Sequence, residues 1–274
     1  MTATINGQGE QVLQYKGRGI TSRQDITVRL IRKEPGFGIK FLIPKKGEQS
    51  LSVEIPALAS SVVNTLRNVT LGIESDRLIL VEHILCAVGL YGIEDLLIEV
   101  HGPEIPLGDG SANFWMDLLE SSGWQQQEVK ADLELKETIV VKKGDRLLMA
   151  IPDDSFSMNY MMDWDHPMIG KVWKSWTPQM GLREIADART FGSEMEHKML
   201  GISDEVVSIT KTGFSKELRW PDEPVRHKLL DLFGDLILAG VNPMRWKARF
   251  ISIKGGHEMD VDMAMKLSEL KGSL

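Results

Sequence analysis

The chain has 274 residues, of which 42% are hydrophobic and 26% are charged, and this composition is typical of a folded globular protein rather than a disordered one. Its net charge of −7 argues against nucleic acid as the main partner, although a small anionic ligand in a local basic pocket stays compatible with it. A single cysteine, Cys86, excludes an intrachain disulfide and a zinc site built from cysteines.

The first half of the chain predicts a mixture of strands and helices. Residues 1–11 lack a basic region followed by an apolar run, so we expect no signal peptide and a cytoplasmic location. Alternating apolar and polar residues predict strands over 24–33 and 38–44, and dense apolar residues predict a helix over 78–90 that ends near Gly92. A strand over 94–100, a turn-rich loop over 102–112 and a helix over 111–123 with Ser111 as its cap follow.

The second half repeats this mixture after a polar, Gln-rich stretch. We place a domain boundary in that stretch, which gives an N-terminal domain over 1–126 and a C-terminal domain over 127–274. The pattern then predicts strands over 137–143, 146–152 and 157–164, an apolar helix over 225–240, and a strand, a Gly-Gly turn and a helix over 246–270. The sequence therefore predicts an α+β protein of two domains with related β-α-α-β layouts.

The apolar helix over 225–240 carries three polar residues at intervals of four. His227, Asp231 and Asp235 project from one face of such a helix. Burying an imidazole or a carboxylate without a partner is costly, and a metal ion is one remedy. Catalytic zinc takes three ligands from His, Asp and Glu and leaves a fourth position open. Glu82 beside His83 resembles the logic of zinc hydrolases, in which a neighbouring carboxylate takes a proton from water.

A purely structural role for these histidine and acidic residues stays open. A histidine on an apolar helix is more often a hydrogen-bonded core residue, and His227 and Asp231 could pair with each other. Glu82 could be a solvated helix residue. The remaining histidines in polar or loop contexts, His101, His166 and His197, are not predicted to be ligands.

Several segments together resemble one family, UDP-3-O-acyl-N-acetylglucosamine deacetylase, the zinc amidase of lipid A synthesis. The resemblance begins at "GRGITSR" (17–23) and spans nearly the whole chain. The longest match is "VEHILCAVGLYGIEDLLIEVHGPEIPLGDGSA" (81–112). Four further motifs follow in the order of the family: "DWDHPMIG" (163–170), "ARTFG" (188–192), "VRHKLLDLFGDL" (225–236) and "KGGH" (254–257).

The resemblance implies a role for each matching position around the metal. It implies that Zn²⁺ is the cofactor and that Glu82 is the general base. It further implies that a protonated His257 gives a proton to the leaving amine and that Asp235 orients and charges His257. Thr190 and Lys228 are implied as further catalytic residues, with Thr190 helping to hold the oxyanion. The implied metal ligands are His83, His227 and Asp231.

The resemblance also implies a UDP-linked, acylated amino sugar as the substrate, bound between the two domains. Phe191 would border it, Trp164 would stack on the uracil with Asp163 nearby, and Lys254 and Arg146 would face the phosphates. The fatty chain implies an apolar passage and makes a position near the membrane surface an expectation. No obligate protein partner is predicted.

The sequence departs from the family pattern around the substrate cleft. Thr21 stands where the family has a histidine, 200–210 lacks a Gly pair, and "GGHEMDVD" places Gly255 where the family has Ser. These departures bear on the substrate rather than on the metal. Two alternatives therefore stay open: a related deacetylase of another nucleotide sugar, and a non-catalytic homologue that binds a sugar nucleotide.

Overall fold

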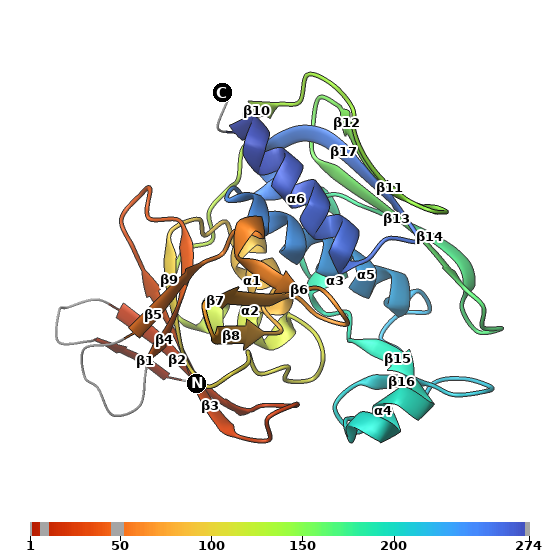
Figure 1. Cartoon of the computed structure of the whole chain (residues 1–274), viewed down its shortest axis with the longest axis horizontal. Helices are drawn as coiled ribbons and strands as arrows, with labels where there is room; N and C mark the ends of the chain where they lie inside the picture. Colours follow the sequence, from red (N-terminus) through yellow and green to blue (C-terminus); the bar gives the residue numbers. More distant parts are fainter. Residues whose placement is uncertain (1, 6–10, 45–51, 272–274) are drawn as a thin grey trace.

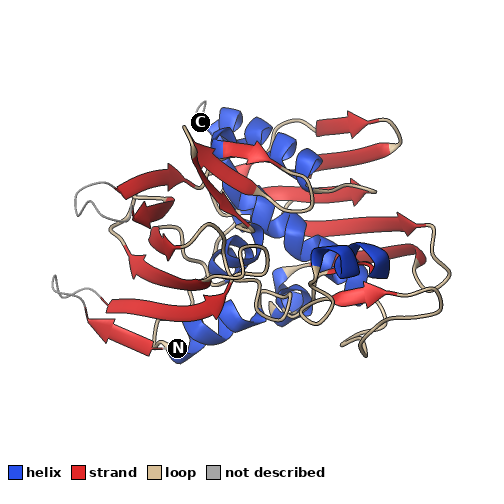
Figure 2. Ribbon diagram, turned by 60° about the horizontal axis from the view of Figure 1, so that its bottom comes forward, coloured by secondary structure: helices blue, strands red, loops and turns tan. Residues whose placement is uncertain are grey.

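The computed structural model describes residues 2–5, 11–44 and 52–271. Most of the segment 1–11, on which the signal-peptide expectation rests, lies outside the described residues. Two large sheets flank a layer of helices, as Figures 1 and 2 show from two directions. Among the described residues, no helix combines the length and the apolar character that crossing a membrane requires.

The first large sheet contains six strands in the order β1-β2-β3-β9-β4-β5. Buried and less buried positions alternate along β3, as expected for a strand with one face on the core. The strand β9 lies between two hairpins, antiparallel to β3 and parallel to β4. The strand bounds are β1 (Thr2–Ile5), β2 (Gln11–Arg18), β3 (Asp25–Arg32), β4 (Ile39–Pro44), β5 (Ser52–Pro56) and β9 (Leu96–His101).

The second large sheet repeats this arrangement with later segments. Its order is β11-β12-β17-β13-β14, with β17 antiparallel to β12 and parallel to β13, and a short β10 pairs with the start of β17. A late strand thus lies between two hairpins in both sheets, which confirms the related layouts. The bounds are β10 (Leu133–Glu134), β11 (Ile139–Lys143), β12 (Arg146–Pro152), β13 (Ser157–Trp164), β14 (Gly170–Trp176) and β17 (Trp246–Ile253).

Smaller elements are attached to each half. The first half carries a three-stranded sheet, and the second half carries a two-stranded sheet with the helix α4, which projects at the lower right of Figure 1. The strands are β6 (Val62–Asn64), β7 (Thr70–Ile73), β8 (Asp76–Ile79), β15 (Phe191–Ser193) and β16 (Val207–Ile209). The short helices are η1 (Ala59–Ser61), η2 (Pro178–Met180), α3 (Arg183–Ala186), α4 (Glu194–Leu200), η3 (Ile237–Ala239) and η4 (Pro243–Arg245).

The longer helices fill the space between the two sheets. The helices α1 and α5 pack against each other, and α5 also contacts α6. Every residue of α1 is buried, as is nearly every residue of α5. A helix that is buried on nearly all sides belongs in such a middle layer, which explains the many apolar residues over 225–240. The bounds are α1 (Glu82–Leu90), α2 (Asn113–Ser121), α5 (Glu223–Leu236) and α6 (His257–Lys271).

Two predicted helix starts were wrong. The helix expected over 78–90 begins only at Glu82, because the preceding residues form β8 and Leu80 has a φ of 66°. Apolar residues continue from β8 into α1, so hydrophobic periodicity cannot separate the strand from the helix. The left-handed backbone conformation of Leu80 ends the strand before the helix begins. The second helix begins at Asn113 with Ala112 as its cap residue, and Ser111 accepts from the Asn113 amide at 3.1 Å instead.

The predicted α+β class is confirmed. Residues before 102 build the first large sheet, and residues after 132 build the second. The exact division into 1–126 and 127–274 stays a prediction.

The contact between α1 and α5 depends on a glycine. A Cβ atom at Gly234 would stand 2.2 Å from the backbone carbonyl oxygen of Glu82. Backbone atoms cannot rotate away as a side chain can, so the two helices would have to separate. Gly234 therefore sets the distance between the helix that carries Glu82 and the helix that carries His227 and Asp231.

We expect Gly234→Ala to lower the stability of the protein. Alanine gains about 1 kcal/mol of helix propensity over glycine, but forcing the helices apart costs about 1–3 kcal/mol or more, and the steric cost prevails because backbone blocks the site. Thermal unfolding measures the change. Gly213→Ala is the matched control, since a Cβ there meets nothing within 4 Å. An unchanged melting temperature in Gly234→Ala would contradict the close packing.

Candidate metal centre and active site

Three predicted ligands from two helices come together at the α1–α5 contact. His83 lies in the first turn of α1, and His227 and Asp231 lie one turn apart on α5. One potential ligand atom of each lies within 4.8 Å of the others, and all three residues are buried. The Asp231 Oδ1 atom is 3.4 Å from His227 Nε2 and 3.9 Å from His83 Nε2.

These residues fit a divalent transition metal. Zinc bonds of about 2.0–2.2 Å in a tetrahedral site place neighbouring ligand atoms roughly 3.3–3.6 Å apart, close to the separations found here. His227 Nδ1 is 3.0 Å from the Ala188 carbonyl oxygen. Since that oxygen can only accept, Nδ1 carries the proton and Nε2 presents its lone pair to the cluster. Two imidazoles and one carboxylate are a donor set of catalytic zinc sites.

The electrostatics favour the metal-binding protonation states. Burial and the neighbouring His227 lower the pKa of His83 to about 3, and burial lowers the pKa of His227. Burial alone would raise the pKa of Asp231, but His227 and Lys228 outweigh it, so that pKa is lowered. Lys228 Nζ donates to Asp231 Oδ2 at 2.7 Å. The site thus holds neutral imidazoles and an ionised carboxylate before any metal binds.

Glu82 precedes His83 and is held at the same place. Its side chain is buried, and Oε2 accepts from the Val69 amide at 3.1 Å. Burial raises the pKa of Glu82 to about 8, while the charge on His257 pulls it down. A carboxyl group with a pKa near neutrality is suited to accept and return protons.

His257 begins α6 and pairs with Asp235 of α5. The two are joined by a 2.7 Å hydrogen bond between Nδ1 and Oδ2, and Asp235 is fully buried. Burial alone would lower the pKa of His257, but the Asp235 carboxylate outweighs it and raises that pKa to about 10. His257 is therefore a cation at neutral pH, and the polar face of α5 reaches from the metal cluster to this cation.

Aromatic residues border the cluster on one side. The Phe191 ring lies 5.9 Å from the His227 ring and 5.1 Å from the Trp164 ring, centroid to centroid. Lys228 Nζ lies 5.8 Å from the centre of the Phe191 ring. The structure thus brings these predicted substrate residues beside a predicted ligand. Thr190 precedes Phe191, and its hydroxyl donates to the Gly110 carbonyl at 2.9 Å.

The predicted phosphate contacts are engaged in ion pairs. Lys254 Nζ lies 2.9 Å from Asp145 and 3.0 Å from Asp163, so this cation joins two carboxylates. Arg146 pairs with Glu258 at 3.0 Å. A phosphate would have to compete with these carboxylates for both side chains.

Several groups that hold the site were not predicted from the sequence. The Ala188 carbonyl and the Val69 amide are backbone groups and leave no signal in a sequence. Asp260 is different, because it follows His257 by three residues on α6 and forms a second buried group of potential ligand atoms with Asp235 and His257. Its helical spacing from His257 could have identified it.

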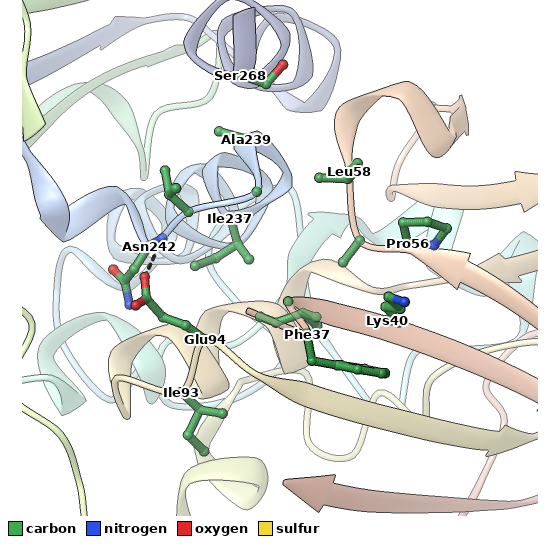
Figure 3. A pocket seen from close by; sticks show the side chains of 15 residues that line it. Phe37, Lys40, Pro56, Leu58, Ile93, Glu94, Ile237, Ala239, Asn242 and Ser268 are labelled. Carbon is green, nitrogen blue, oxygen red and sulfur yellow. Dashed lines mark hydrogen bonds between the residues drawn. The ribbon is translucent and has the colours of Figure 1, made fainter. Parts of the chain in front are cut away.

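A cavity of about 560 Å³ lies elsewhere in the molecule, between the β4–β5 hairpin and the segment that follows α5 (Figure 3). Apolar side chains such as Phe37, Leu58 and Ile237 line it, and Glu94 at its edge accepts from the Asn242 amide at 3.3 Å. None of the predicted site residues borders it. This cavity is therefore separate from the candidate site.

Comparison with known proteins agrees with this geometry. The family model described as "LpxC: UDP-3-O-acyl N-acetylglycosamine deacetylase" matches residues 9–269. This chain belongs to the LpxC family. Proteins named UDP-3-O-acyl-N-acetylglucosamine deacetylase include one from Nostoc sp., 32% identical over 95% of this chain and 97% of its own length. Those from Chlamydia trachomatis and Myxococcus xanthus are 32% and 33% identical over 93% and 94% of this chain, and over 92% and 84% of their own lengths.

The family resemblance drawn from the motifs is thus confirmed. The match to the LpxC family covers both large sheets apart from β1, and it includes every residue assigned to the candidate site. The curated relatives are named as deacetylases, and this chain contains buried His and Asp side chains that could hold a metal ion.

Proposed function

We propose that this protein is a zinc-dependent deacetylase that hydrolyses the acetamide of UDP-3-O-acyl-N-acetylglucosamine and releases acetate, an early committed step of lipid A biosynthesis. The observation that carries the proposal is the meeting of two neutral imidazoles and a carboxylate at one buried point. The carboxyl group of Glu82 and the cationic His257 are coupled electrostatically to each other and to Asp231. The names of the relatives supply the substrate.

His83, His227 and Asp231 would hold the ion. A bound zinc ion supplies Lewis acidity, which makes a water acidic near neutral pH and polarises the carbonyl under attack. Glu82 takes a proton from the attacking water as the new carbon–oxygen bond forms. The Val69 amide holds the Glu82 carboxylate in place for this step.

His257 completes the reaction by protonating the leaving group. An amine leaves readily only when it is protonated, and the Asp235 carboxylate keeps His257 charged until the carbon–nitrogen bond breaks. The proton passes to the amine nitrogen, and acetate and the free amino sugar are the products. Thr190 would help to stabilise the oxyanion, for which its hydroxyl would have to turn away from the Gly110 carbonyl.

The remaining assignments concern the substrate. Phe191 and Trp164 offer aromatic faces next to the metal cluster, and a uracil ring would stack on Trp164 near Asp163. Lys254, Arg146 and Lys228 would face the phosphates and polar groups. We place the reaction in the cytoplasm, near enough to the membrane for the acyl chain, with no protein partner required.

An acetate-release assay combined with metal analysis tests the proposal. We expect about one zinc ion per chain, acetate release from the acylated substrate, loss of that activity on chelation and its return with Zn²⁺. The same assay with UDP-N-acetylglucosamine, which lacks the acyl chain, is the matched control and should give a far lower rate. Equal rates on both compounds would favour the related deacetylase of another nucleotide sugar. Bound zinc without acetate release would favour a non-catalytic homologue.

A further inference from the structure

Asp260 is a buried carboxyl group that the mechanism above does not use. It lies in the first turn of α6, and its side chain is 1% exposed. Neither of its oxygen atoms has a hydrogen-bond partner among the described residues. A buried charge without a partner costs several kcal/mol or more, so such a carboxyl group is either protonated or interacts with a neighbouring polar group.

The neighbours of Asp260 are the pair proposed to protonate the leaving amine. One potential ligand atom each of Asp260, Asp235 and His257 lies within 4.8 Å of the other two. Asp235 uses Oδ2 to accept from His257, while its Oδ1 is buried and also lacks a partner among the described residues. Two buried carboxyl groups thus stand together with unused oxygens. One proton shared between them would satisfy both, directly or through one water.

The charges around Asp260 favour that proton. Lys228 of α5 is already paired with Asp231, and His257 is paired with Asp235. Glu82 of α1 and Tyr160 of β13 are also coupled to this cluster, as are Cys86 and the three residues His83, His227 and Asp231. Burial, and then the negative charge of Asp235, raise the pKa of Asp260 to about 8. Asp260 is therefore neutral at neutral pH, at which the proposed reaction takes place.

We propose that Asp260 is a positioning residue, a neutral carboxylic acid that donates a hydrogen bond to Asp235 and so fixes the carboxylate that orients and charges His257. The inference rests on the proposed function, because it assigns Asp260 a part in proton delivery to the amine. The neutral form matters for this part. A second negative charge beside His257 would strengthen its hold on the proton and weaken it as an acid.

Two substitutions in the zinc-loaded enzyme separate this role from simple packing. Asp260→Asn keeps the shape and always offers an N–H donor, so we expect kcat within about threefold of wild type. Asp260→Leu keeps a similar volume without a donor, and we expect kcat to fall by about 10- to 100-fold, with KM and zinc content unchanged. Asp260→Leu would leave the Asp235 Oδ1 atom buried without a donor, so the melting temperature should fall in Asp260→Leu and be kept in Asp260→Asn.

A loss of kcat in Asp260→Leu protein that is folded and holds zinc is the decisive result. A purely structural role would leave such a folded Asp260→Leu enzyme fully active, and that outcome would overturn the inference. A loss in Asp260→Asn as large as in Asp260→Leu would also overturn it, because the charge rather than the donor would then matter. If the Asp260→Leu protein does not fold, Asp260→Ala replaces it, and its kcat is compared with that of Asp260→Asn.

Measuring the wild-type protein in the same assay distinguishes a failure of the proposed function from a failure of the role proposed for Asp260. Acetate release by the wild type together with full activity of the apolar variants would reject only the role of Asp260. A zinc-loaded wild type that releases no acetate would reject the proposed function, and the role of Asp260 with it.

Discussion

Replacing His83 with alanine removes the bound metal and abolishes acetate release. His83 is the one ligand in the His83, His227 and Asp231 group that comes from α1, so its loss leaves a two-ligand site on α5. A site with two protein ligands holds zinc weakly. The Lewis acidity of the metal supplies several kcal/mol of transition-state stabilisation, so we expect kcat to fall by about 10³-fold or more. Metal analysis and kcat measured on the same preparation test this.

His101→Ala is the matched control for that experiment. His101 is an exposed histidine at the end of β9 that contacts Glu99, and it does not belong to the candidate site. The His101→Ala substitution should leave zinc content and kcat unchanged. A His83→Ala protein that retains one zinc ion per chain would show that the ion is held elsewhere.

Replacing His257 with alanine leaves the metal in place but removes most of the rate. His257 is bonded to Asp235 rather than to the three ligands, so zinc content should equal that of the wild type. Without a general acid the amine must leave unprotonated, and general acid–base catalysis accounts for about 10²- to 10⁴-fold in rate. We expect a loss in that range in kcat, with a smaller change in KM.

The comparison of the two histidine variants is sharper than either one alone. His83→Ala should lose metal and rate together, whereas His257→Ala should lose rate only. Loss of zinc from His257→Ala would contradict the separation of roles. A nearly unchanged kcat in that variant would mean that another group protonates the amine.

Much of the candidate site could be predicted because its signal is local. His227, Asp231 and Asp235 recur every four residues, and an α-helix places such residues on one face whatever surrounds it. The motifs from 81–112 to 254–257 identified the family, which the comparisons confirm. The strand over 157–164 and the strand at the start of 246–270 were also predicted, and buried positions alternate along both in the structure.

Other parts of the fold left no separable signal. The starts of α1 and α2 were misplaced, because apolar periodicity runs from β8 into α1 and because the cap of α2 is one residue later than Ser111. The strands β1, β2, β5, β10 and β14 and the small sheets β6–β8 and β15–β16 were not predicted. The strands of the small sheets have only three or four residues. Such short strands bury little surface of their own and are stabilised by neighbours that are distant in the sequence.

The sequence by itself determined the family, the α+β class and the side chains that face one way along α5. Only the tertiary structure decided that α1 packs closely enough on α5, at Gly234, for His83 to meet His227 and Asp231. It also decided that the Ala188 carbonyl fixes the His227 tautomer and that Asp260 lies beside the Asp235–His257 pair. Helical spacing is a property of a few consecutive residues, whereas these contacts join segments far apart in the chain and exist only once the two halves have packed.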